Sequence, residues 1–357
     1  MSEQAIVFEE KPAAGGKRVG VACLNQPKAL NSLSLPMIRA LEAQLERWAA
    51  DDAIAAVWLE GAGDKAFCAG GDIVALYRSM TEGSSGPDEG VEFFTEEYAL
   101  DYQIHTFPKP IVAWGNGFVM GGGVGLLAGA SHRVVTEHSR VAMPEVTIGL
   151  YPDVGASWFL NHMPGHLGLF IGLTGVHLNA ADACYLGLAD RRIAHEHRDA
   201  VLDGLLQSDD LAAAPQAAVN GVLRTFERES VAVMPTSAVQ ARREAIDELM
   251  DVEGLASQVK RIADYDGDDA WFQRAAKTAR TGSPTTMAIL ERQLRETRLD
   301  GLKTVFDKEL KLSIRCLEKG EFAEGIRALL IDKDKNPRWR YPSLESMDPA
   351  WVAGFFE

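Results

Sequence analysis

The sequence predicts an α/β fold over the first part of the chain, followed by a mostly α-helical region. Up to about residue 196, short apolar runs typical of strands alternate with longer segments of helical periodicity. Beyond residue 197 the periodic segments are helix-like. The chain has 357 residues, which suits one large core and a smaller part, because single cores stop growing at roughly 250–300 residues. We therefore predict a core over residues 1–197 and a helical C-terminal region over residues 198–357.

Five apolar runs predict the strands of the core, at residues 19–24, 54–61, 110–117, 132–137 and 191–196. Helices are predicted at residues 35–50, 72–80, 91–107 and 121–130, with a loop at 84–90. The first helix is amphipathic, and its apolar face and its N-cap, Ser34, can both be read from the sequence; the face is formed by Met37, Leu41, Leu45 and Trp48. This strand–helix–strand order is typical of an α/β core.

The C-terminal region shows helical periodicity almost throughout. Its predicted helices are residues 198–207, 211–230, 235–250, 270–280, 284–300, 302–318 and 321–331. A loop is predicted at 281–284, where the sequence reads TGSP. The charged segment 331–343 contains two prolines, and we expect it to lie on the surface.

Composition excludes several classes of protein. The formal net charge is −15, which argues against nonspecific nucleic-acid binding, because that needs a basic surface. No apolar run approaches the ~20 residues of a membrane span, and the acidic N-terminus indicates no signal peptide. The four cysteines are scattered, so we expect free thiols in a reducing, cytoplasmic setting.

The first candidate motif is KAFCAGGDI (65–73). A strand-like segment runs into Gly70 and Gly71, and Asp72 follows as a possible helix N-cap. Two glycines before a helix can expose backbone N–H groups to an anion or a developing oxyanion. Taken locally, the sequence favours the simpler interpretation, a tight turn with a cap.

The second motif is NGFVMGGGVGLLAGA (116–130). Its triple glycine allows close approach of backbone or ligand, and it places N–H groups at a helix N-terminus. Gly123, Gly125 and Ala128 also match a G-x-G-x-x-A dinucleotide fingerprint, although the fingerprint should follow its strand directly. Close packing of the helix on the sheet is the structural alternative.

The third motif is AMPEVTIGLYPDVG (142–155), which places two carboxylates in an apolar, turn-rich segment. A glutamate in these surroundings would have a raised pKa, and carboxylates in unlike environments are a known acid–base device. Glu145 could equally be a surface glutamate at a strand end, and Asp153 a turn or N-cap residue that opens a helix over 153–161. The spacing does not decide between these alternatives.

Other catalytic patterns are missing from the sequence. The eight histidines show no metal-ligand spacing, and His195 and His197 are predicted to be surface residues of one strand. Neither a G-x-S-x-G elbow nor a Walker-type phosphate loop is present. We expect no metal and no bound cofactor.

Together the motifs resemble the crotonase (enoyl-CoA hydratase/isomerase) superfamily over residues 18–195. The resemblance rests on PKALNSL (27–33), the two Gly-rich motifs, MPEVTIGLYPDVG (143–155) and LTGVHLNAADACYLGLAD (173–190). It implies a spiral of ββα repeats and a CoA thioester ligand. It also implies that the N–H groups of Gly71 and Gly122 bind the thioester oxygen, beside the substrate-binding residues Gly70, Asp72 and Gly121.

The resemblance also bears on the reaction. Hydratases of this superfamily use two glutamates; one matches Glu145, and the other falls at Gly125. Over nearly the whole chain, EEYALDY (96–102), PEVTIGLYPDVG (144–155) and IDKDKNPRW (331–339) resemble the 3-hydroxyisobutyryl-CoA hydrolase family. That resemblance implies catalytic roles for Glu145 and Asp153, contact of Glu97 with the substrate hydroxyl, and hydrolysis of a 3-hydroxyacyl-CoA in valine catabolism.

Several alternatives stay open at this point. An enoyl-CoA hydratase or isomerase, a CoA-binding protein without catalysis, and a nicotinamide dehydrogenase are competing functions. Glu145 could attack the thioester or activate water. Lys28 and Lys65 are candidates for the CoA phosphates, and the chain could be a monomer, a trimer or a hexamer. We predict that both carboxylates face one cavity within reach of the Gly71 and Gly122 amides.

Overall fold

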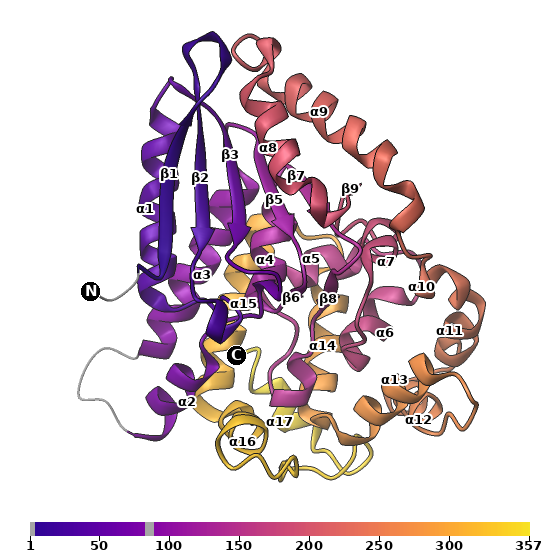
Figure 1. Cartoon of the computed structure of the whole chain (residues 1–357). Helices are drawn as coiled ribbons and strands as arrows, with labels where there is room; N and C mark the ends of the chain where they lie inside the picture. The colour runs from indigo at the N-terminus through magenta and orange to yellow at the C-terminus, as the bar shows by residue number, and fades with distance from the viewer. Residues whose placement is uncertain (1–3, 83–88) are drawn as a thin grey trace. The chain divides into compact units, whose positions relative to one another are not determined.

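A computed structural model describes residues 4–82 and 89–357. Figure 1 labels the helices and strands along the chain. Contacts group the chain into two compact units, each built from three separate segments. Unit 1 comprises Met1–Gly71, Ala99–Val141 and Leu178–Ala241, and unit 2 comprises Asp72–Tyr98, Ala142–His177 and Arg242–Glu357. The predicted division at residue 197 remains a prediction, although the last strand of the described residues does end at Arg192.

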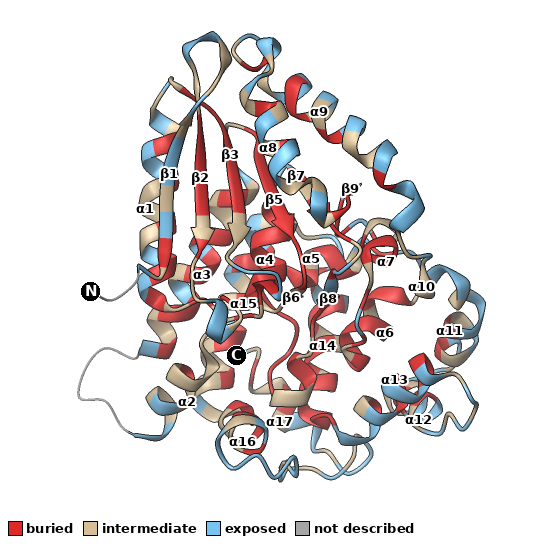
Figure 2. Ribbon diagram, viewed as in Figure 1, coloured by how far each residue is buried: buried red, intermediate tan, exposed pale blue. Residues whose placement is uncertain are grey.

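Unit 1 contains a six-stranded sheet in the order β1-β2-β3-β5-β7-β9. Its strands are β1 (Ile6–Pro12), β2 (Arg18–Leu24), β3 (Ile54–Gly61), β5 (Ile111–Gly115), β7 (His132–Val135) and β9 (Arg191–Arg192). β1 runs antiparallel to β2, and the other pairs are parallel. Parallel strands are normally covered on both faces, and Figure 2 shows β2, β3 and β5 buried along most of their length.

Helices cover both faces of this sheet. Val19 and Val21 of β2 face a core shared with α8 (Arg198–Leu206) and α9 (Pro215–Ser230). Gly20 points the other way, because side chains alternate along a strand. A Cβ on Gly20 would lie 2.6 Å from the ring of Trp48 in α1 (Leu35–Ala50), so the glycine allows α1 to pack closely.

A second, three-stranded sheet has the order β4-β6-β8. Its strands are β4 (Ala66–Cys68), β6 (Phe118–Met120) and β8 (Arg140–Ala142). β4 and β6 are parallel, with Ala66 opposite Phe118. Their carboxyl ends therefore lie at the same edge, where α4 (Gly122–Gly129) begins after β6.

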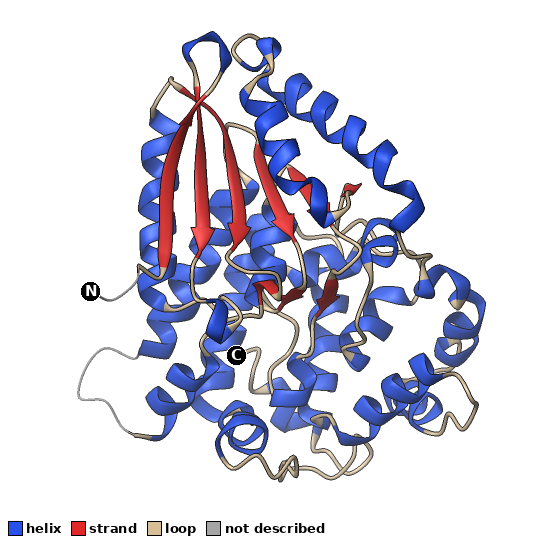
Figure 3. Cartoon of the chain, viewed as in Figure 1, coloured by secondary structure: helices blue, strands red, loops and turns tan. Residues whose placement is uncertain are grey.

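The described residues of unit 2 form helices and loops apart from the end of β8, as Figure 3 shows. It contains α2 (Ile73–Thr81), the first part of α3 (Glu89–His105) and α5 (Ala156–Asn161). Its remaining helices are α6 (Leu167–Thr174), α11 (Arg243–Met250), α12 (Leu255–Ala263), α13 (Ala270–Thr281), α14 (Pro284–Thr297), α15 (Leu302–Lys319), α16 (Phe322–Ile326) and α17 (Pro349–Ala353). None of the helices formed by the described residues is long and apolar enough to cross a membrane.

The structure corrects several sequence-based expectations. β1, β6, β8 and four short helices were not expected, the helices being α6, α7 (Ala180–Tyr185), α12 and α17. The predicted helix 235–250 is divided into α10 (Ala238–Ala241) and α11. The strand predicted at 191–196 ends at Arg192, because the chain turns into a 3-10 helix at His195. Ser34 precedes α1 without a side-chain capping bond. Most of the loop predicted at 84–90 lies outside the described residues.

Candidate active site

The two Gly-rich turns of unit 1 lie against each other. Gly70 follows β4 at φ 101°, and Gly121 follows β6 at φ 48°. A Cβ on Gly70 would lie 3.4 Å from the carbonyl oxygen of Met120 and 4.0 Å from the Cα of Gly121. Both turns need glycine, since other residues rarely adopt positive φ. The pairing of β4 with β6 thus brings two motifs together that are about 50 residues apart.

Gly122 and Gly71 each directly follow one of these turns; Gly122 is buried and Gly71 is partly exposed. Gly122 is the first residue of α4, so its N–H has no partner within the helix, and the helix dipole favours negative charge there. Gly71 forms an isolated bridge with Leu33. The side chain of Asp72 accepts a hydrogen bond from Ala75 N at 3.1 Å, which confirms it as the N-cap of α2. Contact of these residues with substrate remains a prediction.

The remaining glycines of the triple-glycine motif pack inside the helix. Gly123 and Gly125 lie within α4 rather than in a turn before it. A Cβ on Gly123 would lie 2.2 Å from the carbonyl oxygen of Cys68, and one on Gly125 would lie 2.6 Å from the carboxylate of Asp101 in α3. The dinucleotide hypothesis therefore lacks its glycine turn, and close packing explains both positions.

Glu145 is buried in unit 2. It begins a 3-10 turn, η3 (Glu145–Ile148), and is only 5% exposed. Ser283 N donates to the carbonyl oxygen of Val146 at 2.9 Å, which ties η3 to the start of α14. The surface-glutamate alternative is wrong, because this side chain belongs to the interior. Burial raises the pKa of Glu145 well above its ordinary value, and the charge of nearby Asp153 raises it further.

Asp153 is buried in the same unit, at 4% exposure. Its Oδ2 accepts a hydrogen bond from the Tyr98 hydroxyl at 2.5 Å. Gly155, not Asp153, occupies the cap position of α5, so the N-cap alternative is wrong. The pKa of Asp153 is raised to about 6. Burial is the largest cause of the rise, and the hydrogen bond from Tyr98 limits it. Glu145 and Asp153 are therefore two buried carboxyls with raised pKa values, and the charge of one acts on the pKa of the other, which makes them candidates for an acid–base pair.

Helix α15 holds the segment that carries Asp153. The buried carboxyl group of Glu309 accepts from Gly155 N at 2.6 Å and from Ser157 N at 2.8 Å. Ser313, one turn later, lies 2.7 Å from the Tyr98 hydroxyl and 2.9 Å from the Tyr151 hydroxyl. These residues were missed at the sequence level. The available signal was a glutamate on the apolar face of the predicted helix 302–318.

Backbone strain accompanies these contacts. Val154 has φ 54°, in the left-handed region that a β-branched residue rarely enters, and Gly155 follows at φ 85°. Such strain persists only where surrounding contacts hold it, and it clusters at functional sites. Here the hydrogen bonds from Gly155 and Ser157 to Glu309 hold the turn directly after Asp153.

The other predicted binding residues lie in different settings. Glu97 is buried at 2% exposure in α3, next to Tyr98. Lys28, in a 3-10 turn after β2, and Lys65, before β4, are exposed. Among residues 4–82 and 89–357, no group of three His, Cys, Asp or Glu side chains could hold a metal ion. Convergence of the carboxyl pair with the Gly71 and Gly122 amides remains a prediction.

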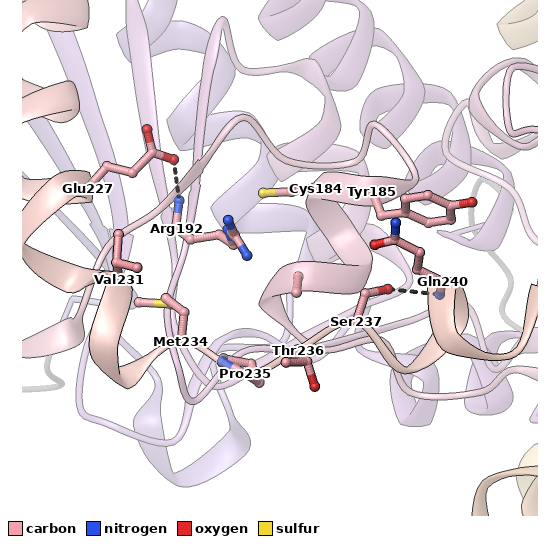
Figure 4. A pocket seen from close by; sticks show the side chains of 11 residues that line it. Cys184, Tyr185, Arg192, Glu227, Val231, Met234, Pro235, Thr236, Ser237 and Gln240 are labelled. Carbon is pink, nitrogen blue, oxygen red and sulfur yellow. Dashed lines mark hydrogen bonds between the residues drawn. The ribbon is translucent and has the colours of Figure 1, made fainter.

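A separate cavity of unit 1 holds none of the predicted site residues (Figure 4). It measures about 580 Å³ and is lined by α7, β9, α9 and α10. Cys184 and the Arg192 guanidinium lie inside it, while Glu227 pairs with Arg191 at 3.0 Å. Burial raises the pKa of Cys184 to about 11, so its thiol stays protonated at neutral pH. Cys184 is therefore not activated as a nucleophile.

A family profile and full-length relatives both match this chain. The enoyl-CoA hydratase/isomerase profile matches residues 19–356. The mitochondrial 3-hydroxyisobutyryl-CoA hydrolase of Danio rerio is 39% identical over 94% of this chain and 86% of its own length. The 3-hydroxyisobutyryl-CoA hydrolase 1 of Arabidopsis thaliana is 34% identical over 100% of this chain and 92% of its own.

Solved structures share the fold at full length. A carnitinyl-CoA dehydratase from Mycobacterium thermoresistibile has a TM-score of 0.86 and 34% identity, and an enoyl-CoA hydratase from Rhodobacter sphaeroides has 0.82 and 32%. Each comparison covers 99% of this chain and 97% of the other. These similarities confirm the predicted crotonase-type α/β fold. The names of these similar proteins nevertheless cover more than one reaction.

Proposed function

Because this chain belongs to the enoyl-CoA hydratase/isomerase family, we propose that it is an acyl-CoA thioester hydrolase that acts on 3-hydroxyisobutyryl-CoA. The observation that carries the proposal is the buried pair of Glu145 and Asp153, both with raised pKa values. The relatives named 3-hydroxyisobutyryl-CoA hydrolase support the same substrate. This reaction would be a step of valine catabolism.

Each predicted residue has a part in the proposed reaction. The N–H groups of Gly71 and Gly122 form an oxyanion hole for the thioester oxygen; donors of this kind contribute about 3–4 kcal/mol each to transition-state stabilisation. The two turns lie together in unit 1, which supports a joint role. Gly70 and Gly121 shape these turns. Glu97 binds the substrate hydroxyl, and Lys28 and Lys65 attract the CoA phosphates.

The carboxyl pair would perform the chemistry. The acyl carbon gains an oxygen from water, the C–S bond breaks, and the CoA sulfur leaves with a proton. One carboxylate must accept a proton from water, and one carboxylic acid can supply a proton to sulfur. A direct attack by Glu145, giving a mixed anhydride that water then hydrolyses, reaches the same products. Neither route uses a metal or cofactor.

A panel of acyl-CoA substrates tests the proposal. Released CoA thiol is measured with 3-hydroxyisobutyryl-CoA, its straight-chain 3-hydroxy isomer and unsubstituted acyl-CoAs, using the natural chain and Glu145→Gln. We expect the branched 3-hydroxyacyl-CoA to have the highest kcat/KM, and the variant to bind it without turnover. Absence of thiol release from every 3-hydroxyacyl-CoA would reject the hydrolase function.

The alternative function, hydration of an enoyl-CoA, is tested by a separate measurement with crotonyl-CoA. Asp101 brings a carboxylate against Gly125, the position at which hydratases are expected to have their second glutamate. Loss of the crotonyl-CoA absorbance band on addition of the protein would favour hydration. We expect no loss, because Asp101 is 0% exposed and is enclosed by packing.

Location and assembly belong to the same proposal. The relatives in Danio rerio and Dictyostelium discoideum are named as mitochondrial proteins, while the composition predicts the cytoplasm for this chain. Cell fractionation decides between the two. Light scattering of the purified protein distinguishes a monomer from a trimer or hexamer.

A further inference from the structure

We propose that Tyr98, Ser313 and Tyr151 form a reversible chain of hydroxyl groups that lets Asp153 both release and accept a proton. Asp153 would thereby be the proton-transfer member of the carboxyl pair, and the three hydroxyl residues would be its positioning residues. The use of this proton in thioester hydrolysis rests on the proposed function. The existence of the chain of hydroxyl groups does not.

The chain consists of four short contacts within unit 2. Asp153 Oδ2 lies 2.5 Å from the Tyr98 hydroxyl, which lies 2.7 Å from Ser313 Oγ. Ser313 Oγ lies 2.9 Å from the Tyr151 hydroxyl, which lies 2.9 Å from the carbonyl oxygen of Glu309. All these side chains are buried. Burial raises the pKa values of both tyrosines well above their ordinary range, so their hydroxyls keep their hydrogens.

The hydroxyl chain has enough hydrogens and acceptors for both the protonated and the ionised state of Asp153. When Asp153 is protonated, four hydrogens serve four contacts: Asp153 donates to Tyr98, Tyr98 to Ser313, Ser313 to Tyr151, and Tyr151 to the Glu309 carbonyl. When Asp153 is ionised, the direction reverses, and Tyr151 donates to Ser313, Ser313 to Tyr98, and Tyr98 to the carboxylate. The Glu309 carbonyl then keeps its ordinary helical hydrogen bond. Gain or loss of one proton at Asp153 Oδ2, together with rotation of the hydroxyls, connects the two states.

Glu145 has no comparable arrangement. Its Oε2 is buried without a hydrogen-bond partner among residues 4–82 and 89–357, and the hydrogen bond that lowers the pKa of its carboxyl comes from its own backbone, not from a chain of side-chain hydroxyls. A buried polar atom without a partner is costly in either charge state. The asymmetry between the two carboxyls therefore assigns proton uptake and release to Asp153.

The surroundings keep the proton of Asp153 exchangeable. The titratable groups that face it are Glu145, Tyr98, Tyr151, and Glu309 and Cys316 of α15. No cation of the described residues forms an ion pair with Asp153. Burial therefore raises its pKa, and the Tyr98 hydrogen bond limits the rise, to about 6. A group with this pKa can hold or release a proton near neutral pH.

In the proposed hydrolysis the proton follows a closed path. As water adds to the acyl carbonyl, Asp153 takes a proton from the water, and the chain reverses. As the C–S bond breaks, Asp153 returns that proton to the CoA sulfur, and the chain reverts. No hydrogen leaves the chain of hydroxyls, so it needs no exit to solvent.

Two substitutions should move the pKa of Asp153 in opposite directions. Tyr98→Phe keeps the ring among Phe94 and Phe306 but removes the donor to the ionised carboxylate, so the pKa of Asp153 should rise. Ser313→Ala leaves that donor in place. It removes the acceptor that the Tyr98 hydroxyl needs when Asp153 is protonated, so the pKa should fall.

The pKa is read by carbon NMR of labelled aspartate carboxyls, with Asp153→Asn to identify the signal, and independently from the acidic limb of the kcat/KM profile. Tyr151→Phe removes the last hydroxyl of the chain, and we expect the smallest shift of the three variants there, because Ser313 can then donate to its own helix carbonyl. If the pKa of Asp153 shifts in the same direction in Tyr98→Phe and Ser313→Ala, or shifts in neither, the proposed chain of hydroxyl groups is wrong. The NMR titration stands even if no substrate is hydrolysed, which separates failure of the chain from failure of the proposed function.

Discussion

The Gly-rich turns of unit 1 and the acid-bearing segment of unit 2 are positioned by different kinds of contact. Each turn depends on its own glycine, Gly70 or Gly121, and on the short pairing of β4 with β6. Asp153 depends on residues remote in sequence, since its turn is bonded to Glu309, and the hydroxyl chain ends at the same helix. Local motifs thus form the turns, whereas helix α15, remote in sequence, holds the segment that carries Asp153.

The largest expected effect concerns the carboxyl pair. Glu145→Gln and Asp153→Asn should each lower kcat by roughly 10²–10⁴-fold, the usual contribution of a positioned acid or base. The free energy of unfolding should change little or increase, because a neutral amide replaces a desolvated carboxyl. Steady-state kinetics and thermal unfolding measure the two quantities. An unchanged kcat for Glu145→Gln would show that this residue is not catalytic.

Close packing in unit 1 can be tested at Gly125. Gly125→Ala would place a Cβ 2.6 Å from the Asp101 carboxylate, so something must shift, at a cost of about 1–3 kcal/mol of unfolding free energy. Gly221→Ala, in the interior of α9, is the matched control, since no atom lies within 4 Å of its added Cβ. We expect it to stabilise the protein by about 0.5–1 kcal/mol. Equal effects in chemical denaturation would contradict the packing argument.

The role of α15 predicts a pH dependence of stability. Burial raises the pKa of Glu309 to about 8 from an ordinary 4.5. The folded state therefore binds this proton more tightly than the unfolded state. Its stabilising contribution is complete below about pH 4.5 and is lost as pH rises through about 8, with a slope of up to about 1.4 kcal/mol per pH unit.

Glu309→Gln removes this titration. In urea unfolding between pH 5 and pH 8, the stability of this variant should fall less steeply with pH than that of the natural protein. Its stability at pH 5 should also be lower, because the side-chain amide cannot accept hydrogen bonds from both Gly155 N and Ser157 N. An identical slope in the two proteins would exclude Glu309 as the titrating group.

The smallest expected effect is a local one, at the start of α2. Asp72→Ala removes the cap bond to Ala75 N and should cost about 0.5–2 kcal/mol of unfolding free energy. Asp72→Asn keeps an acceptor oxygen and should restore most of that loss. If Asp72→Asn instead weakens acyl-CoA binding while stability is preserved, Asp72 contacts substrate as well as capping the helix.

Sequence-based prediction succeeded where a structure depends on neighbouring residues. The helix at residues 35–50 agrees with α1 at both ends, because its apolar spacing is a local signal, although Ser34 makes no side-chain capping bond. Strands of three residues, such as β6 and β8, are too short for an alternating pattern, and their pairing defines them. Asp153 looked like an N-cap because Pro-Asp-Val-Gly is a usual turn signal. Only the Tyr98 contact, 55 residues away in sequence, shows that its side chain turns inward.

The sequence by itself determined the α/β core with helices after it, the glycine positions of the two turns, and the family of the chain, because these depend on residue type, order and spacing. The tertiary structure decided which carboxyls are buried and what donates to them. Burial sets the pKa values of Glu145 and Asp153, and burial results from α3, α14 and α15 packing around one short segment. Desolvation and hydrogen bonding act through space, so no local pattern of residues could have assigned the proton to one of the two acids.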